Sequence, residues 1–160
     1  MAIVMLSIPP DTFLADASHQ KKMDIFEGEM AKLPQTYLPL CHRFTPGLYV
    51  REIFMPKGTI VTSRTHKTTH PFVISKGIVD VINEQGKIER LSAPYTGTTN
   101  AGTRRVLVTL EDTIWTSFHP TEKTDPIEIE EEITESSNDL IPHQFKPAYL
   151  GNPRDVSFLA

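Results

Sequence analysis

Short runs of apolar and β-branched residues recur through the middle of the chain. Between Phe44 and Pro120 these runs are rich in Val, Ile, Thr, Phe and Tyr, and Gly, Pro, Asn and Asp interrupt them at intervals of roughly ten residues. The interruptions fit turns. The pattern predicts strands at residues 49–55, 59–65, 70–75, 78–83, 88–92, 95–98, 104–110 and 113–119. Short strands without helices between them favour an all-β jelly roll and exclude an α/β fold, because parallel strands need long crossover segments.

The segment before these strands follows a different pattern. Within residues 1–43, Met23, Phe26 and Met30 recur at helical spacing. We therefore predict an N-terminal arm that contains one short helix at residues 21–32.

The barrel is expected to span residues 44–121, followed by an acidic helix and an extended tail at 122–160. Asp125 and Pro126 supply a good N-cap and a good first helical position. The isoleucines that follow fit a helix or, by their first alternation, a strand, and the cap favours the helix. The glutamates of residues 128–135 are expected to form a solvated face. Three prolines predict the extended tail: Pro142, Pro147 and Pro153.

Composition narrows the class of protein. The 160 residues suit one domain, and 39% hydrophobic with 22% charged residues is typical of a soluble globular protein. No run is long enough to span a membrane, and the apolar start lacks a basic region, so we expect neither a membrane partner nor a secretory signal, and a cytoplasmic location. The single cysteine, Cys41, is expected to be a small buried hydrophobe without a catalytic role. A net charge of −4 argues against nucleic acid as a partner.

The residues most suggestive of chemistry lie on the second and third predicted strands and on the turn that joins them. Arg64, His66, His70, Phe72 and Ile74 share even parity, and alternate residues of a strand share one face. That face would be partly cationic, partly imidazole and then apolar. Such a combination is typical of the mouth of a small-molecule cavity.

Two segments resemble the motifs of the cupin superfamily. The stretch from Gly58 to Gly77 is similar to the first motif, a glycine, a His-x-His pair, a glutamate and a closing glycine. The stretch from Asn100 to Arg105 is similar to the second motif, Pro-x-Gly-x-x-His. The resemblance implies a cupin-type jelly-roll barrel. The four positions that hold a metal ion in metal-binding cupins are here occupied by Arg64, His66, His70 and Arg105.

This substitution pattern implies a degraded metal site. Arginine stays protonated and offers no lone pair to a metal, so two of the four ligand positions are lost. The expectation is no cofactor. The alternative is one divalent transition metal held by three imidazoles: His66, His70 and His119.

The amino-acid sequence of the barrel also resembles the short cupin-like proteins encoded by tailed bacteriophages. The resemblance implies their fold and brings no catalytic residue with it. It rests on the segments 46–54, 75–77, 93–95, 102–106 and 111–121.

The arginines and aromatic residues each allow two interpretations. Arg64 and Arg105, with Arg104 and Lys67, would suit a phosphate, carboxylate or nucleotide. Alternatively, one of the adjacent arginines points into solvent and the other pairs with Glu52, Glu111 or Asp112. Aromatic side chains either stack on a ligand's sugar or base or belong to the core. These are Phe72, Tyr95 and Trp115.

These observations favour a non-enzymatic binding or assembly module of phage type that forms a homo-oligomer. Its partners would be phage structural proteins or a small anionic ligand, bound by Arg64, His66, His70, Arg105 and Trp115. A phage-encoded protein would act in the host cytoplasm or the virion. The alternative is a metal-dependent cupin oxygenase or sugar isomerase that uses His66 and His70.

Overall fold

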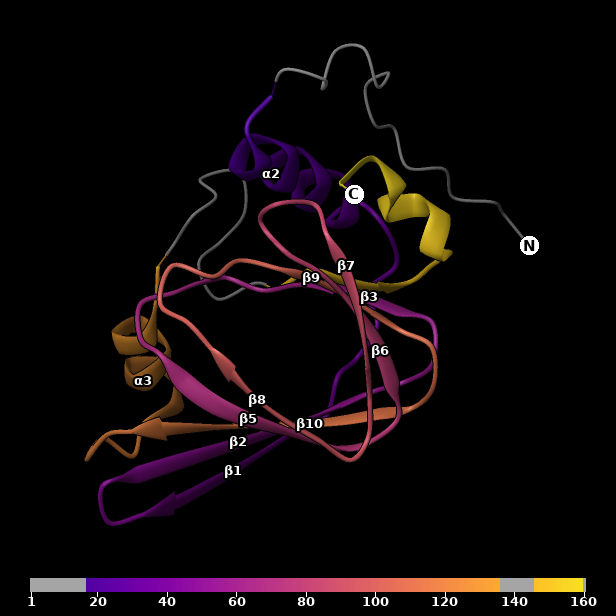
Figure 1. Cartoon of the computed structure of the whole chain (residues 1–160). Helices are drawn as coiled ribbons and strands as arrows, with labels where there is room; N and C mark the ends of the chain where they lie inside the picture. Colours follow the sequence, from indigo (N-terminus) through magenta and orange to yellow (C-terminus); the bar gives the residue numbers. More distant parts are fainter. Residues whose placement is uncertain (1–16, 136–145, 160) are drawn as a thin grey trace.

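Two five-stranded antiparallel sheets face each other and close into a barrel (Figure 1). The computed structural model describes residues 17–135 and 146–159. The first sheet has the order β1 (Leu40–Thr45), β2 (Leu48–Met55), β10 (Thr113–Pro120), β5 (His70–Lys76) and β8 (Tyr95–Thr99). The second has the order β12 (Ala148–Leu150), β3 (Thr59–Thr62), β9 (Val106–Thr109), β6 (Ile78–Ile82) and β7 (Ile88–Ser92). A small extra ladder joins β4 (Thr65–His66) to β11 (Thr134–Glu135).

The all-β jelly-roll prediction is confirmed, and every predicted strand is present. The run expected at 59–65 is divided, because the chain leaves the sheet after Thr62 and pairs again only at Thr65. The run expected at 104–110 begins at Val106. Just before Val106, side chains accept the backbone hydrogen bonds in place of a neighbouring strand. The Arg104 N–H donates to the Glu84 carboxylate, and the Arg105 N–H donates to the Ser63 hydroxyl.

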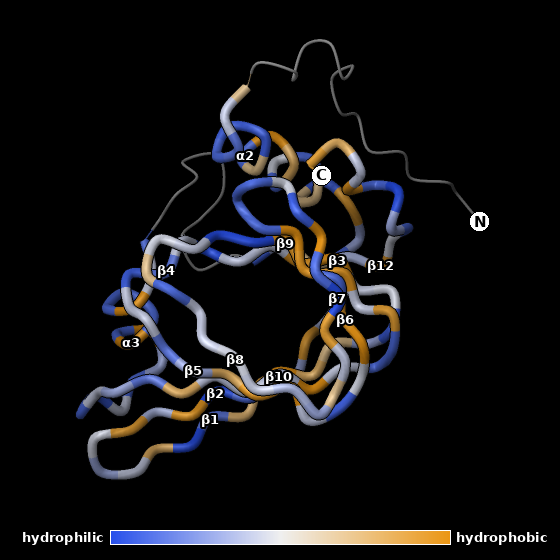
Figure 2. The backbone as a smooth tube through the Cα atoms, in the orientation of Figure 1, coloured by the Kyte–Doolittle hydropathy of each residue, from blue (hydrophilic) through white to orange (hydrophobic). Residues whose placement is uncertain are grey.

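Apolar side chains form two main layers, one inside the barrel and one outside the second sheet. Ile53, Val61, Phe72, Ile74 and Trp115 belong to the inner layer. Figure 2 shows hydrophobic positions gathered where β3, β6 and β9 run side by side. These strands therefore bury both faces.

The outer layer is completed by helix α2 (His19–Met30) and the 3-10 helix η1 (Pro153–Leu159), which lie over β3 and β9 (Figure 1). The helix predicted from Met23, Phe26 and Met30 is confirmed, and all three side chains are buried. Ser18 caps it by accepting a hydrogen bond from the Lys21 N–H.

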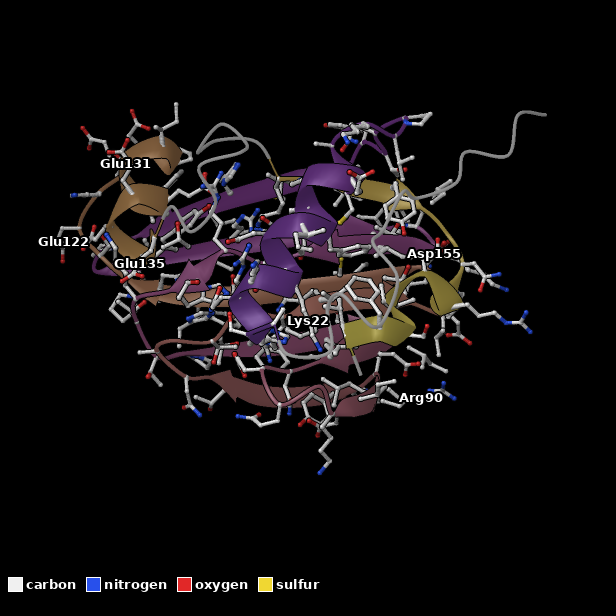
Figure 3. The ribbon with its side chains drawn as sticks, turned by 90° about the horizontal axis from the view of Figure 1, so that it is seen from above. Lys22, Arg90, Glu122, Glu131, Glu135 and Asp155 are labelled. Atoms are coloured by element: carbon white, nitrogen blue, oxygen red, sulfur yellow. The ribbon has the colours of Figure 1, made fainter. Side chains whose placement is uncertain are left out.

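The predicted acidic helix is confirmed as α3 (Pro126–Ile133), with the Asp125 carboxylate accepting from the Ile127 N–H. Its glutamates mostly face solvent, as expected, and Figure 3 shows Glu122, Glu131 and Glu135 together around α3, away from Arg90 and Asp155. Among the described residues, no helix is long and apolar enough to cross a bilayer.

The segment expected as an extended tail is integrated into the barrel where it is described. Ala148–Leu150 pairs with β3, and Val156 and Leu159 pack in the outer layer. Prolines prevent an α-helix here but permit an edge strand and a 3-10 turn. Pro9, Pro10 and Pro142 lie outside the described residues.

The expectation that Cys41 is buried is wrong. It lies on β1, an edge strand on which every residue is exposed. Because β1 pairs only with β2 among the described strands, it has no layer covering it.

Candidate anion-binding site

A cavity of about 80 Å³ lies inside the barrel and is walled by both sheets. This space holds several water molecules or one small anion. Its lining combines an apolar wall, small hydroxyl side chains, two imidazoles and three basic side chains, and no described carboxylate lines it. The lining residues are Arg51, Ile53, Met55, Val61, Thr62, Ser63, His66, His70, Thr99, Arg105, Leu107, Trp115, Ser117 and Lys146.

Strand alternation explains most of this lining. On β10, Thr113, Trp115, Ser117 and His119 are buried while their neighbours are not. All three predicted alternate positions on β5 are likewise buried: His70, Phe72 and Ile74. The even-numbered residues of β5 and the odd-numbered residues of β10 therefore point into the barrel.

Adjacent arginines serve opposite sides of the second sheet. The Arg104 side chain is fully buried against α2, where it donates to Asp24 and Glu27 at 2.8 Å each and to Gln20. The partners expected for this pair, Glu52, Glu111 and Asp112, are therefore wrong. The actual partners come from a helix far away in the sequence.

Arg105 points the other way, into the cavity. Its guanidinium donates to the Thr99 hydroxyl at 2.6 Å and lies 5.7 Å from the ring centroids of both Phe72 and Trp115. Those two rings stack at 4.2 Å and support it from one side. Unlike Arg104, it has no ion pair within 4 Å among the described residues. Burial lowers the pKa of Arg105, with Glu84 and Glu89 opposing that shift.

Arg51 and Lys146 add two more cationic groups to the wall. The charge of Arg51, followed by burial, lowers the pKa of Lys146 to about 7, against an opposing effect of Glu130. Three cationic side chains around one cavity concentrate positive potential in it.

Three imidazole rings meet beside these cations. The ring centroids of His66 and His70 are 4.9 Å apart, and those of His70 and His119 are 4.2 Å apart. Burial, then His70, lowers the pKa of His66 to about 2 and that of His119 to about 3. All three rings are therefore neutral near pH 7.

The histidines do not fit a metal centre. In the part of the chain that the structure describes, no three His, Cys, Asp or Glu side chains are arranged to hold a metal ion. The cavity that His66 and His70 line also contains Arg51, Arg105 and Lys146, which repel a cation. His119 lies behind His70 and shares a 3.0 Å hydrogen bond with Ser117, outside the lining.

Two polar atoms of the lining have no hydrogen-bond partner among the described residues. These are the Thr62 hydroxyl and Nδ1 of His66. The Thr62 side chain is 1% exposed. Buried polar groups are normally satisfied, so both atoms are available to a bound molecule.

The structure brings together four of the five side chains expected to bind a ligand: His66, His70, Arg105 and Trp115. Arg64 does not join them. Its guanidinium lies 3.3 Å from Glu130 of α3, because the break in the strand at residues 63–64 interrupts the alternation on which the expectation depended.

Several lining residues were not predicted from the sequence, among them Arg51, Thr62 and Lys146. Strand alternation could have predicted Arg51, since it shares one face of β2 with the buried Tyr49, Ile53 and Met55. No pattern in the sequence predicts Lys146, because it reaches the cavity from a segment without local periodicity.

A second, larger cavity of about 480 Å³ adjoins the first. Arg51, Ile53 and Lys146 line both. The larger space also contacts residues 35–38, Leu40 and Glu130. The inner, cationic cavity and this outer one therefore form two compartments that meet at Arg51 and Lys146.

Comparison with known proteins supports the fold. No protein-family model matches the chain, and no curated protein sequence matches it. Among solved structures, ectoine synthase from P. lautus superposes with a TM-score of 0.54 at 8% identity, covering 95% of this chain and 92% of that one. KdgF from Halomonas sp. gives a TM-score of 0.45 at 17% identity, over 57% of this chain and 91% of that one. The cupin domain of Cnp3 from Schizosaccharomyces pombe gives 0.45 at 16% identity, over 64% and 71%.

At these identities the likeness concerns architecture. The two facing antiparallel sheets and the cavity between them agree with it. The chain therefore has an all-β, cupin-type jelly-roll fold.

Proposed function

We propose that this protein is a non-enzymatic binding module that holds a small anionic ligand inside its barrel. One observation carries the proposal: Arg51, Arg105 and Lys146 line a single cavity that no described carboxylate lines. A buried cation without a counter-charge costs several kcal/mol, and an anionic ligand removes that cost.

Arg104 and Arg105 supply an internal comparison for this argument. Both enter from the same turn, yet Arg104 is neutralised by two carboxylates and Arg105 by none within 4 Å among the described residues. Arg104 thus has the contacts of a structural ion pair. Arg105 donates to the uncharged Thr99 hydroxyl, and the rest of its guanidinium can bond to phosphate or carboxylate.

Size and chemistry define the ligand further. The inner cavity admits a phosphate or carboxylate group, for which the Thr62 hydroxyl and the His66 ring offer further hydrogen bonds. The outer cavity lies within the usual range for organic ligands. We therefore propose a ligand with one anionic head in the inner compartment and an organic body in the outer one.

Phosphate should raise the melting temperature in a concentration-dependent manner. At a concentration one hundred times its dissociation constant, a ligand adds about 2.7 kcal/mol to the free energy of unfolding. Arg105→Ala and, independently, Arg51→Ala should lose this response, as measured by differential scanning fluorimetry at pH 6.5. The response should weaken above pH 7, because Lys146 then loses its proton.

Arg90→Ala is the matched control, since it removes an exposed arginine outside the cavity and should leave the phosphate response intact. Zinc and manganese should not stabilise the wild type. Stabilisation by either metal, with no response to phosphate, would replace the anion site by the metal-dependent enzyme that uses His66 and His70.

An assembly role is the second part of the proposal, and it rests on β1. This edge strand is exposed along its whole length and carries Leu40 and Phe44, which are 42% and 38% exposed. An unpaired edge is a template for strand addition, and we propose a second copy of this chain as the partner. Because the sequence resembles phage-encoded proteins, we propose that such an assembly acts in a phage or its host.

Sedimentation equilibrium should give the mass of a dimer or larger oligomer at micromolar concentration. Phe44→Lys should shift the equilibrium toward monomer, because charge on an edge strand opposes pairing. The exposed Ile88 lies on β7, and Ile88→Lys should have no effect. A wild-type protein that is monomeric at all concentrations measured would exclude the assembly role.

A further inference from the structure

Lys146 lies at the junction of the two cavities. Its half-buried side chain lines both the inner and the outer one. Any ligand that extends from one compartment to the other must pass it.

The surroundings of Lys146 favour the uncharged amine. No described carboxylate forms an ion pair with its ammonium within 4 Å. The repulsion from Arg51, the loss of hydration and the charge of Arg64 lower the pKa of Lys146 to about 7, against the opposing charges of Glu130 and Glu27. A large share of the side chain is thus an amine at neutral pH, whereas a fully solvated alkyl amine is neutral in only about one molecule in a thousand. Lysines with cationic neighbours and restricted hydration are those that attack carbonyl groups.

The same cavity supplies the remaining parts of such a site. Arg51 and Arg105 can hold a carboxylate, and Ile53 and Trp115 form an apolar wall that limits the water available to reverse a condensation. We propose that Lys146 condenses reversibly with the carbonyl group of a small 2-oxo acid whose carboxylate is held by Arg51 and Arg105. This inference rests on the proposed anion site and narrows its ligand to an anionic carbonyl compound.

The reaction balances without another reactant. The amine nitrogen of Lys146 bonds to the carbonyl carbon, and the π electrons of the carbonyl move to oxygen. One N–H proton passes to that oxygen and gives a carbinolamine. The nitrogen lone pair then expels the oxygen, which leaves as water with the second N–H proton. A C=N bond to Lys146 remains, and nothing is oxidised or reduced.

Reductive trapping with glyoxylate tests this. The full-length protein is incubated at pH 7.5 with glyoxylate and cyanoborohydride, and peptide mass spectrometry follows the adduct at each lysine. Lys146 should be modified at least about tenfold faster than the exposed Lys57 or Lys87, owing to its larger neutral fraction and the bound carboxylate. Excess phosphate should suppress the modification of Lys146 alone, and its rate should level off above about pH 7.

Arg51→Ala should slow the reaction of Lys146 and leave that of Lys57 unchanged. Circular dichroism must show that the variant is folded, because unfolding would also remove the cavity around Lys146 and slow its reaction relative to Lys57. Modification of Lys146 no faster than of Lys57, in a protein that phosphate still stabilises, would overturn the carbonyl site and leave the anion site standing. Failure of phosphate to stabilise the wild type would overturn the anion site itself.

Discussion

Replacement of Arg104 by alanine should lower the free energy of unfolding by about 3–5 kcal/mol, the usual cost of removing one member of a buried ion pair. Arg104 is fully buried and bridges the barrel to α2 through Asp24 and Glu27. Without it, the Glu27 carboxylate, itself 5% exposed, keeps its burial and loses a charged donor. Urea denaturation followed by circular dichroism measures the loss.

Two further variants separate this effect from a simple loss of charge. Arg90→Ala removes an exposed arginine that makes a two-point contact with Asp80, at 2.8 and 3.0 Å, and it should change stability little because solvent screens that pair. The double variant Arg104→Met/Glu27→Leu should recover part of the stability that Arg104→Ala loses, since it leaves fewer buried charges. If Arg90→Ala and Arg104→Ala lowered the free energy of unfolding equally, the contact of Arg104 with α2 would not explain its effect on stability.

Acidification from pH 7 to pH 5 should destabilise the protein by about 2–4 kcal/mol. Burial and neighbouring positive groups lower the pKa of His66 to about 2 and of His119 to about 3, from the ordinary value of 6.5. Below pH 6.5 the unfolded chain binds protons at these residues and the folded chain does not. A lowered pKa therefore means full stability above pH 6.5 and a progressive loss as the pH falls.

Urea titrations at half-unit intervals between pH 7 and pH 5 would measure this slope. Most carboxyl groups stay ionised over this interval, so imidazoles dominate the change. His66→Asn and His119→Asn should each flatten the curve, and the double variant should flatten it most. A stability that is constant or rises toward pH 5 would contradict the neutral, buried imidazole cluster.

Local patterns predicted the parts of the fold that depend on neighbours in the chain. Turn residues and β-branched runs located the barrel strands, and Asp125 with Pro126 located α3. The strands β1 and β12 were missed, because β1 is exposed at every position and shows no alternation, and β12 has only three residues.

The site was predictable only where strands stay regular. His70 and Trp115 occupy the expected face because β5 and β10 alternate without interruption as far as those residues. Arg64 leaves that face at a two-residue break that no local signal marks. Arg104 finds its partners about 80 residues earlier, and such a pairing follows from the docking of α2, which a sequence pattern does not describe.

The opposed directions of Arg104 and Arg105 make their spacing from β9 critical. Both residues directly precede β9, which begins at Val106, and the side chains of an extended segment alternate with a period of two. One residue inserted between Arg105 and Val106 would therefore move Arg105 to the side that faces α2 and leave the cavity without its guanidinium. The carboxylates of α2 would still meet an arginine. An insertion at this point should thus abolish the anion site and spare the helix anchor, whereas the loop can absorb an insertion farther back in the turn.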